Sequence, residues 1–141
     1  MRFWDTSAVV PLCVSEAASA QMRRILEVDR ALAVWWCTRT ECASALARRR
    51  RERALTPTGE QHAKRVLDAL SEAWSEVTPT DALRARAERL LAVHPLRAAD
   101  AFQLAAALVW AKGSTASFTF ISLNERLRES ARQEGFRLLP D

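Results

Sequence analysis

Acidic and amide side chains occur at four points where a predicted strand ends or a predicted helix begins. These residues are Asp5, Glu41, Asp100 and Asn124. Carboxylates brought within ~6 Å of each other raise one another's pKa values unless a positive charge lies among them. The chain's two lysines lie elsewhere in the sequence. A hard divalent cation, Mg²⁺ or Mn²⁺, would compensate the charge, because such ions prefer oxygen ligands.

A cation held by acidic residues predicts hydrolysis of a phosphodiester bond, because the metal lowers the pKa of a bound water and offsets charge on the phosphate. Asp5, Glu41 and Asp100 are the predicted catalytic and metal-binding residues, with Asn124 as a weaker fourth ligand. Hydroxyl groups beside them could orient water or phosphate, or could equally be helix caps or strand-end hydroxyls. These hydroxyls belong to Thr6, Ser7 and Ser122.

Each of these acidic and amide residues also has a purely structural interpretation, because acids, amides and hydroxyls are good helix caps. The candidate caps are Asp5 or Thr6-Ser7, the capping boxes Thr38–Glu41 and Asp100–Gln103, and Asn124. A basic run late in one helix is likewise open to two interpretations. It is either a solvated helix end that suits the helix dipole or a track for the phosphates of RNA. Its members are Arg48, Arg49, Arg50 and Arg51.

The predicted elements alternate between strand and helix, which indicates a parallel sheet covered on both faces, a three-layer α/β/α fold. Strands are predicted at residues 2–4, 31–36, 76–78, 117–123 and 136–139. Helices are predicted from residue 6 and at 17–28, 38–53, 56–74, 81–93, 98–112 and 125–134. In such a fold ligands bind beyond the carboxyl ends of the strands. The architecture is therefore expected to bring residues 5, 41, 100 and 124 to one edge.

The composition sets broad limits on the class of protein. The chain has 141 residues, enough for one domain spanning 1–141, and 49% of them are apolar, which disfavours disorder. The net charge of +4 fits an acidic partner such as nucleic acid, and fits a merely basic protein equally well. Three cysteines at no zinc spacing favour a reducing cytoplasm. No stretch approaches the ~20 apolar residues of a membrane span.

Two further features of the sequence favour a structural interpretation. The N-terminal apolar run imitates a signal peptide, but Pro11 interrupts it and Glu16 ends it, so we expect no cleavage. Trp35 and Trp36 lie in the predicted strand 31–36, where packing in the core is favoured over stacking on a base.

Four stretches of the chain resemble, in order, the motifs of the PIN-domain family, and specifically of VapC-type toxins from bacterial toxin–antitoxin pairs. The stretches are residues 4–10, 40–46, 94–105, and 120–127 followed by 134–136. Together they span nearly the whole chain. Asp5, Glu41 and Asp100 fall on the family's acidic positions. The fourth acidic position is commonly Asp and is Asn124 here, which puts a second metal ion in doubt.

The resemblance implies a PIN-like α/β/α fold and an endoribonuclease that depends on Mg²⁺ or Mn²⁺, the toxin of a type II pair. It also implies a homodimer and a cognate VapB-like antitoxin whose C-terminal segment covers the active groove. The alternative is a catalytically impaired PIN-like module that binds RNA or protein, for which Asn124 is the only support. A phospho-accepting receiver domain is disfavoured, because Asp5 lacks an adjacent acid and both lysines lie in predicted helices.

Overall fold

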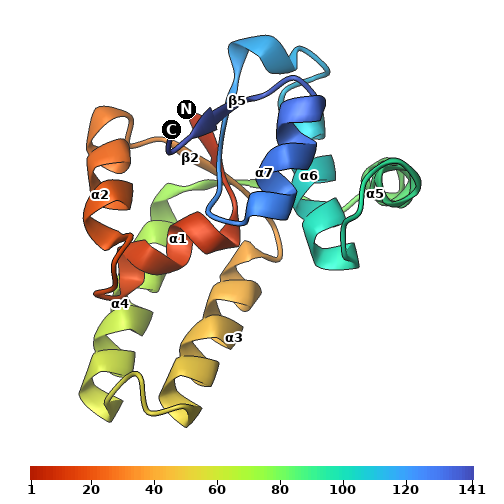
Figure 1. The fold of residues 1–141 in the computed structure, drawn as a ribbon. Helices are drawn as coiled ribbons and strands as arrows, with labels where there is room; N and C mark the ends of the chain where they lie inside the picture. Colours follow the sequence, from red (N-terminus) through yellow and green to blue (C-terminus); the bar gives the residue numbers. More distant parts are fainter.

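A computed structural model describes all residues, 1–141 (Figure 1). The strands are β1 (Arg2–Trp4), β2 (Leu32–Trp35), β3 (Ser75–Val77), β4 (Thr119–Ile121) and β5 (Arg137–Leu139). The helices are α1 (Thr6–Cys13), α2 (Ser19–Val28), α3 (Thr38–Arg51), α4 (Pro57–Ala73), α5 (Asp81–Val93), α6 (Ala98–Trp110) and α7 (Glu125–Gln133). A short 3-10 helix (Thr115–Ser117) precedes β4.

All five strands run parallel, in the order β3-β2-β1-β4-β5. In the centre of the sheet, Phe3 of β1 pairs with Ala33 of β2 on one side and with Phe120 of β4 on the other. The predicted α/β class with a parallel sheet is therefore confirmed. Because the strands share one direction, the loops that leave their carboxyl ends meet at one edge.

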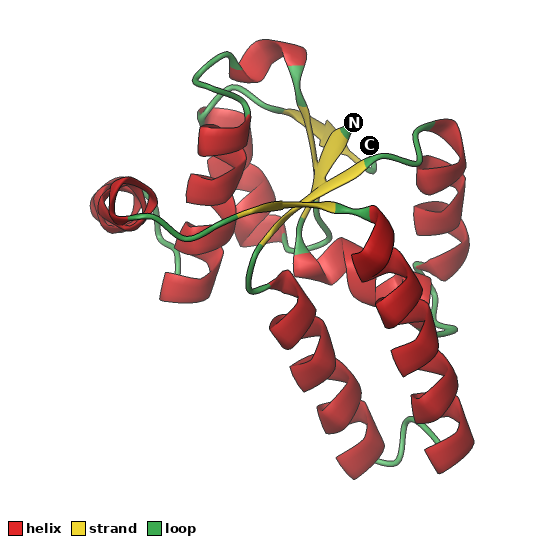
Figure 2. Cartoon of the chain, turned by 180° about the vertical axis from the view of Figure 1, so that it is seen from behind, coloured by secondary structure: helices red, strands yellow, loops and turns green.

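Successive side chains of β1, β2 and β4 enter two separate cores, as the alternation of a β-strand requires. Phe3 and Phe120 pack with α5, α6 and α7 on one face, where their rings stack with centroids 5.5 Å apart. Trp4 and Ile121 pack with α1, α2, α3 and α4 on the other face. Figure 2 shows the sheet lying between these two groups of helices. Both faces of the sheet are buried, as predicted.

Two helices begin at threonine caps. Thr56 Oγ1 accepts a 3.0 Å hydrogen bond from the backbone N–H of Gly59, and Pro57 occupies the first position of α4, where its missing N–H costs nothing. Thr80 caps α5 in the same way. No helix combines the length and the apolar character needed to cross a membrane.

The structure corrects the prediction for the strand at 31–36. β2 ends at Trp35, and the chain turns at Trp36 and Cys37 into α3. Trp35 is 4% exposed and stacks on Phe102, whereas Trp36 is 52% exposed. The interpretation of Trp36 as a core residue is wrong, because the turn carries its indole out of the sheet's alternation and into solvent.

Candidate active site

A pocket of about 540 Å³ at the carboxyl edge of the sheet is lined by all three predicted acids. Asp5 comes from the end of β1, Glu41 from the first turn of α3 and Asp100 from the first turn of α6. The remaining lining includes Thr6, Ser7, Ser44, Arg48, Arg49 and Asn124. Because the strands are parallel, residues that are far apart in the sequence come together at one edge of the sheet.

Asp5 is almost completely buried, at 5% exposure, and two serine hydroxyls hold its carboxylate. The hydroxyls of Ser7 and Ser122 both donate to Oδ2, the second over 2.7 Å. Burial raises the pKa of Asp5 from 3.8 to about 6, and the two hydroxyl hydrogen bonds oppose that rise. Asp5 makes no side-chain cap to α1, and neither Thr6 nor Ser7 is the N-cap. Asp5 therefore occupies the N-cap position of α1 without capping it through its side chain, and the prediction that Thr6 or Ser7 caps the helix is wrong.

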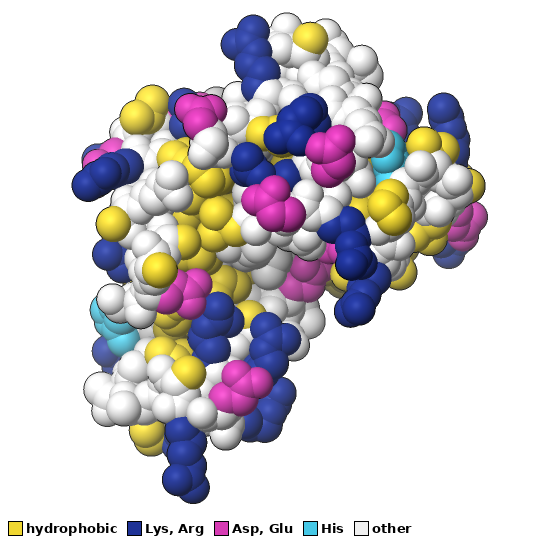
Figure 3. Space-filling model, viewed as in Figure 1, with side chains coloured by type: hydrophobic (Ala, Val, Ile, Leu, Met, Phe, Trp, Pro, Cys, Tyr) yellow, Lys and Arg dark blue, Asp and Glu magenta, His cyan; other side chains and the backbone are white.

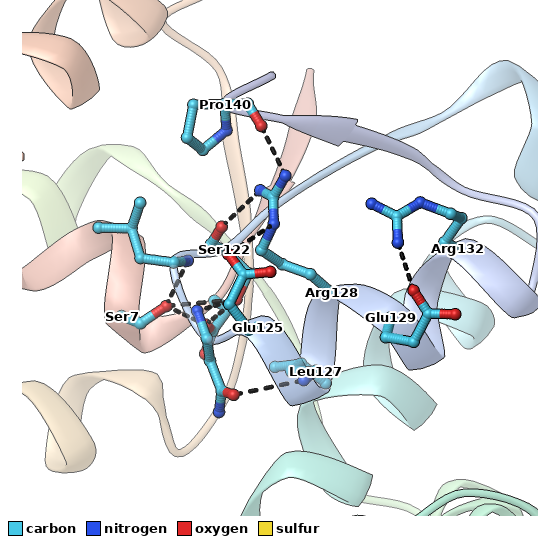
Figure 4. Close-up of polar contacts among 11 residues, drawn as sticks. Ser7, Ser122, Glu125, Leu127, Arg128, Glu129, Arg132 and Pro140 are labelled. Atoms are coloured by element: carbon cyan, nitrogen blue, oxygen red, sulfur yellow. Dashed lines mark hydrogen bonds and ion pairs between the residues drawn. The ribbon is translucent and has the colours of Figure 1, made fainter.

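The two serines that hold Asp5 are themselves fixed by neighbouring segments (Figure 4). Ser7 Oγ accepts from the backbone N–H of Leu123 over 2.8 Å. Arg128 of α7, only 8% exposed, donates 2.9 Å to the carbonyl of Ser122 and 2.7 Å to that of Pro140. The buried guanidinium thereby ties the loop after β4 to the C-terminal residues.

Glu41 is held at one carboxylate oxygen, Oε2, by two neutral donors. Thr6 Oγ1 lies 2.6 Å away and Gln103 Nε2 lies 3.1 Å away. The predicted capping box with Thr38 does not form, because Cys37 is the N-cap of α3 and provides no side-chain cap. Thr38 is instead fully buried and accepts from Gln103 Nε2 over 3.1 Å.

Asp100 is half-buried, and burial raises its pKa, an effect that Arg126 and Arg97 oppose. Its capping role is also wrong, because α6 begins after Arg97 with no side-chain cap. Asn124 connects Asp100 to α7 in two ways. Its Nδ2 donates 3.2 Å to Asp100 Oδ1, and its Oδ1 accepts 3.3 Å from the backbone N–H of Leu127. The predicted N-cap of the last helix is therefore confirmed.

None of the three carboxylates forms an ion pair, and each has one oxygen with no side-chain hydrogen-bond partner. These oxygens are Asp5 Oδ1, Glu41 Oε1 and Asp100 Oδ2. The structure holds no group of three or more His, Cys, Asp or Glu side chains arranged as an assembled metal site. The donor chemistry nevertheless suits Mg²⁺ or Mn²⁺, since such ions keep several waters and need only one or two carboxylates.

The four arginines at the end of α3 do not all face the same part of the molecule. Arg48 and Arg49 line the acidic pocket, and Arg49 pairs with Glu16 over 3.1 Å. Arg50 turns toward Glu60 of α4, 3.4 Å away, and does not line the pocket; nor does Arg51. Lys and Arg side chains gather over the part of the molecule where α3 and α4 extend away from the sheet (Figure 3). Arg48 is exposed and free of ion pairs.

Sequence reasoning did not assign two residues that the structure connects to the site, Gln103 and Arg128. Gln103 lies three positions after Asp100 on α6, so helical periodicity could have placed both side chains on one face. Arg128 lies four positions after Asn124 on α7, but no sequence signal indicates that a guanidinium in a surface helix is buried.

Comparison with known proteins gives similarity to solved structures. No family model matches the chain, and no curated protein sequence matches it. Among solved structures, the crystal structure of PAE2754 from Pyrobaculum aerophilum is similar, with a TM-score of 0.67 and 15% sequence identity. The match covers 98% of this chain and 83% of the other. At this identity the likeness supports the fold alone.

Proposed function

We propose that the chain is an endoribonuclease that depends on Mg²⁺ or Mn²⁺ and uses Asp5, Glu41 and Asp100. The observation that carries the proposal is the pocket itself: three carboxylates without cationic partners line it, while the exposed Arg48 stands on its wall. Acids collected in one pocket without compensation are costly unless a cation joins them. Arginine beside them suits a phosphate-bearing substrate.

A bound divalent ion would polarise the phosphate and supply a water of lowered pKa as nucleophile. The residues of the chain would do the rest. Asp5 and Asp100, whose pKa values are raised by burial, would offer carboxylate oxygens to the cation, and its binding would favour their charged forms. Ser7 and Ser122 keep the Asp5 carboxylate in one orientation. Arg48 binds a phosphate of the RNA strand next to the reacting one.

As biological context we propose the toxin of a type II pair, acting in the cytoplasm as a homodimer with a VapB-like antitoxin. The support is the ordered resemblance to VapC-type toxins of four stretches, 4–10, 40–46, 94–105, and 120–127 followed by 134–136.

A second candidate function is a catalytically impaired module that binds RNA or protein. Asn124 favours it, because an amide hydrogen-bonded to Asp100 replaces a fourth carboxylate that would attract cations. The two candidates differ in one observable, cleavage of RNA by the purified protein in the presence of metal.

The test is a cleavage assay on mixed-sequence single-stranded RNA with Mg²⁺, with Mn²⁺ and with EDTA. Asp5→Asn and Asp100→Asn should abolish cleavage while the protein stays folded. Asp68→Asn is the matched control, because Asp68 is an exposed acid on α4 paired with Arg39 outside the pocket. Cleavage that persists in EDTA, or in both variants, would refute the proposed function. RNA binding without cleavage in any metal would favour the impaired module.

A further inference from the structure

Gln103 is a polar residue on the buried face of α6, where packing alone does not require a polar side chain. It is 1% exposed, and the residues that follow it, Leu104 to Leu108, are all buried and apolar. Its Nε2 lies 2.9 Å from Thr6 Oγ1, 3.1 Å from Thr38 Oγ1 and 3.1 Å from Glu41 Oε2. One amide nitrogen thus joins the first turns of α1 and α3 to α6.

The other end of the same amide has no partner. Gln103 Oε1 is buried and accepts no hydrogen bond. A buried acceptor that has lost water without gaining a donor destabilises the folded state, and such groups in native proteins call for an explanation. An apolar side chain of similar size would remove this acceptor but would leave the fully buried Thr38 Oγ1 without its hydrogen bond from Nε2. What glutamine provides at this position is therefore the set of contacts that Nε2 makes.

The hydrogen bonds of Nε2 fix the direction of the Thr6 hydroxyl. Gln103 offers its N–H to Thr6 Oγ1, so the hydroxyl hydrogen of Thr6 is directed to Glu41 Oε2, 2.6 Å away. Nε2 also lies close to the same carboxylate oxygen, so its two hydrogens are shared among three acceptors, Thr6 Oγ1, Thr38 Oγ1 and Glu41 Oε2. Both contacts hold Oε2 from the protein side, which leaves Oε1 of Glu41 as the oxygen available in the pocket.

We infer that Gln103 is a positioning residue for Glu41: it holds Oε2 of Glu41, so that Oε1 of Glu41 is free to bind a divalent cation. This role explains why the buried acceptor of Gln103, its own Oε1, has no partner. This inference rests on the proposed metal-dependent function. It is distinct from that proposal, because Gln103 itself touches neither the cation nor the RNA. Partners that orient a metal-binding side chain typically change metal affinity by 10–100-fold when they are removed.

The experiment compares Gln103→Met with the unsubstituted protein by calorimetric titration of Mn²⁺ without RNA, together with thermal unfolding in EDTA. Methionine fills similar space and removes the donor and the unpartnered acceptor together. We expect Mn²⁺ affinity to fall roughly tenfold, together with a lower melting temperature because the buried Thr38 hydroxyl loses its hydrogen bond. In cleavage assays at limiting metal, kcat should fall while KM for RNA stays unchanged. Ser19→Ala is the control, because Ser19 is buried and hydrogen-bonded away from the pocket; it should lower stability and leave Mn²⁺ affinity unchanged.

A lower melting temperature with unchanged Mn²⁺ affinity in Gln103→Met would overturn the inference and make the residue a structural crosslink. Gln103→Asn replaces the methionine variant if that protein does not fold, since the shorter amide cannot span the same three contacts and should also weaken Mn²⁺ binding. Absence of Mn²⁺ binding by the unsubstituted protein would refute the proposed function and this inference together. Binding that survives Gln103→Met would refute this inference alone.

Discussion

Ser122 and Asp5 join the carboxyl ends of two neighbouring strands by a 2.7 Å hydrogen bond from Ser122 Oγ to Asp5 Oδ2. Asp5 follows β1 and Ser122 follows β4, so the bond crosses between adjacent strands of the sheet. Ser122 is completely buried, and Arg128 holds its carbonyl from α7. The orientation of the most buried acid in the pocket therefore depends on how β4 and α7 are joined.

Ser122→Ala should weaken Mn²⁺ binding roughly tenfold, because the hydroxyl orients the Asp5 carboxylate and stabilises its charged form. The lost hydrogen bond should also lower the free energy of unfolding by about 1 kcal/mol. Calorimetric titration and urea unfolding measure the two effects. Ser130→Ala removes another buried hydroxyl, on α7, which bonds to a carbonyl outside the pocket. It should change stability only, and equal metal affinity in both variants would contradict the role of Ser122.

Ionisation of the Asp5 carboxyl should lower the free energy of unfolding of the metal-free protein as the pH rises. Its pKa is about 6 in the folded protein and 3.8 when unperturbed, so folding favours the protonated carboxyl. The stabilisation is complete below about pH 3.8 and is lost as the pH rises through about 6. The 2.2-unit difference corresponds to about 3 kcal/mol. Urea unfolding in EDTA between pH 4 and 8, a range set by these two values, measures it.

Asp5→Asn removes the ionisation and should flatten this part of the pH profile. Mn²⁺ added to the unsubstituted protein at neutral pH should restore stability, because a bound cation favours the charged carboxylate. A profile of the same slope in the Asn variant would show that another group causes the pH dependence.

Asn124→Asp should have opposite effects with and without metal. The cap of α7 survives, since Asn and Asp cap helices about equally well. The hydrogen bond from Asn124 Nδ2 to Asp100 Oδ1 is replaced by two facing carboxyl groups, which raises the pKa of Asp100 further. We expect a loss of about 1 kcal/mol in stability in EDTA at neutral pH and several-fold tighter Mn²⁺ binding. Unchanged stability and unchanged affinity would place residue 124 outside the metal site, as a cap only.

Arg48→Ala should reduce the dependence of RNA binding on salt concentration by about one slope unit, as expected for one lost phosphate contact. Arg50→Ala is the matched control, because Arg50 belongs to the same run but pairs with Glu60 on α4. Binding measured in EDTA over a series of salt concentrations separates affinity from cleavage. Equal slopes for the two variants would mean that the run acts only as a diffuse basic surface.

The order of the elements and the edge at which the acids meet could both be predicted from the sequence. Strands that alternate with helices form a parallel sheet, and the residues that follow parallel strands gather at the carboxyl ends. The cap at Asn124 is a local interaction between residues three apart, and it was predicted from the sequence. The position of Asp5, Glu41 and Asp100 along the chain was sufficient to expect a shared pocket.

Only the tertiary structure decided which polar side chains hold which acids. Gln103 meets Thr6 across 97 positions of the chain, and both had local interpretations as parts of helix caps. The arginine run likewise divides, because the direction of each side chain depends on which neighbouring helix faces it: Arg48 faces the pocket and Arg50 faces α4. Local patterns specify elements, since their interactions span a few residues. Pairing between polar groups depends on distances that exist only after the layers have packed.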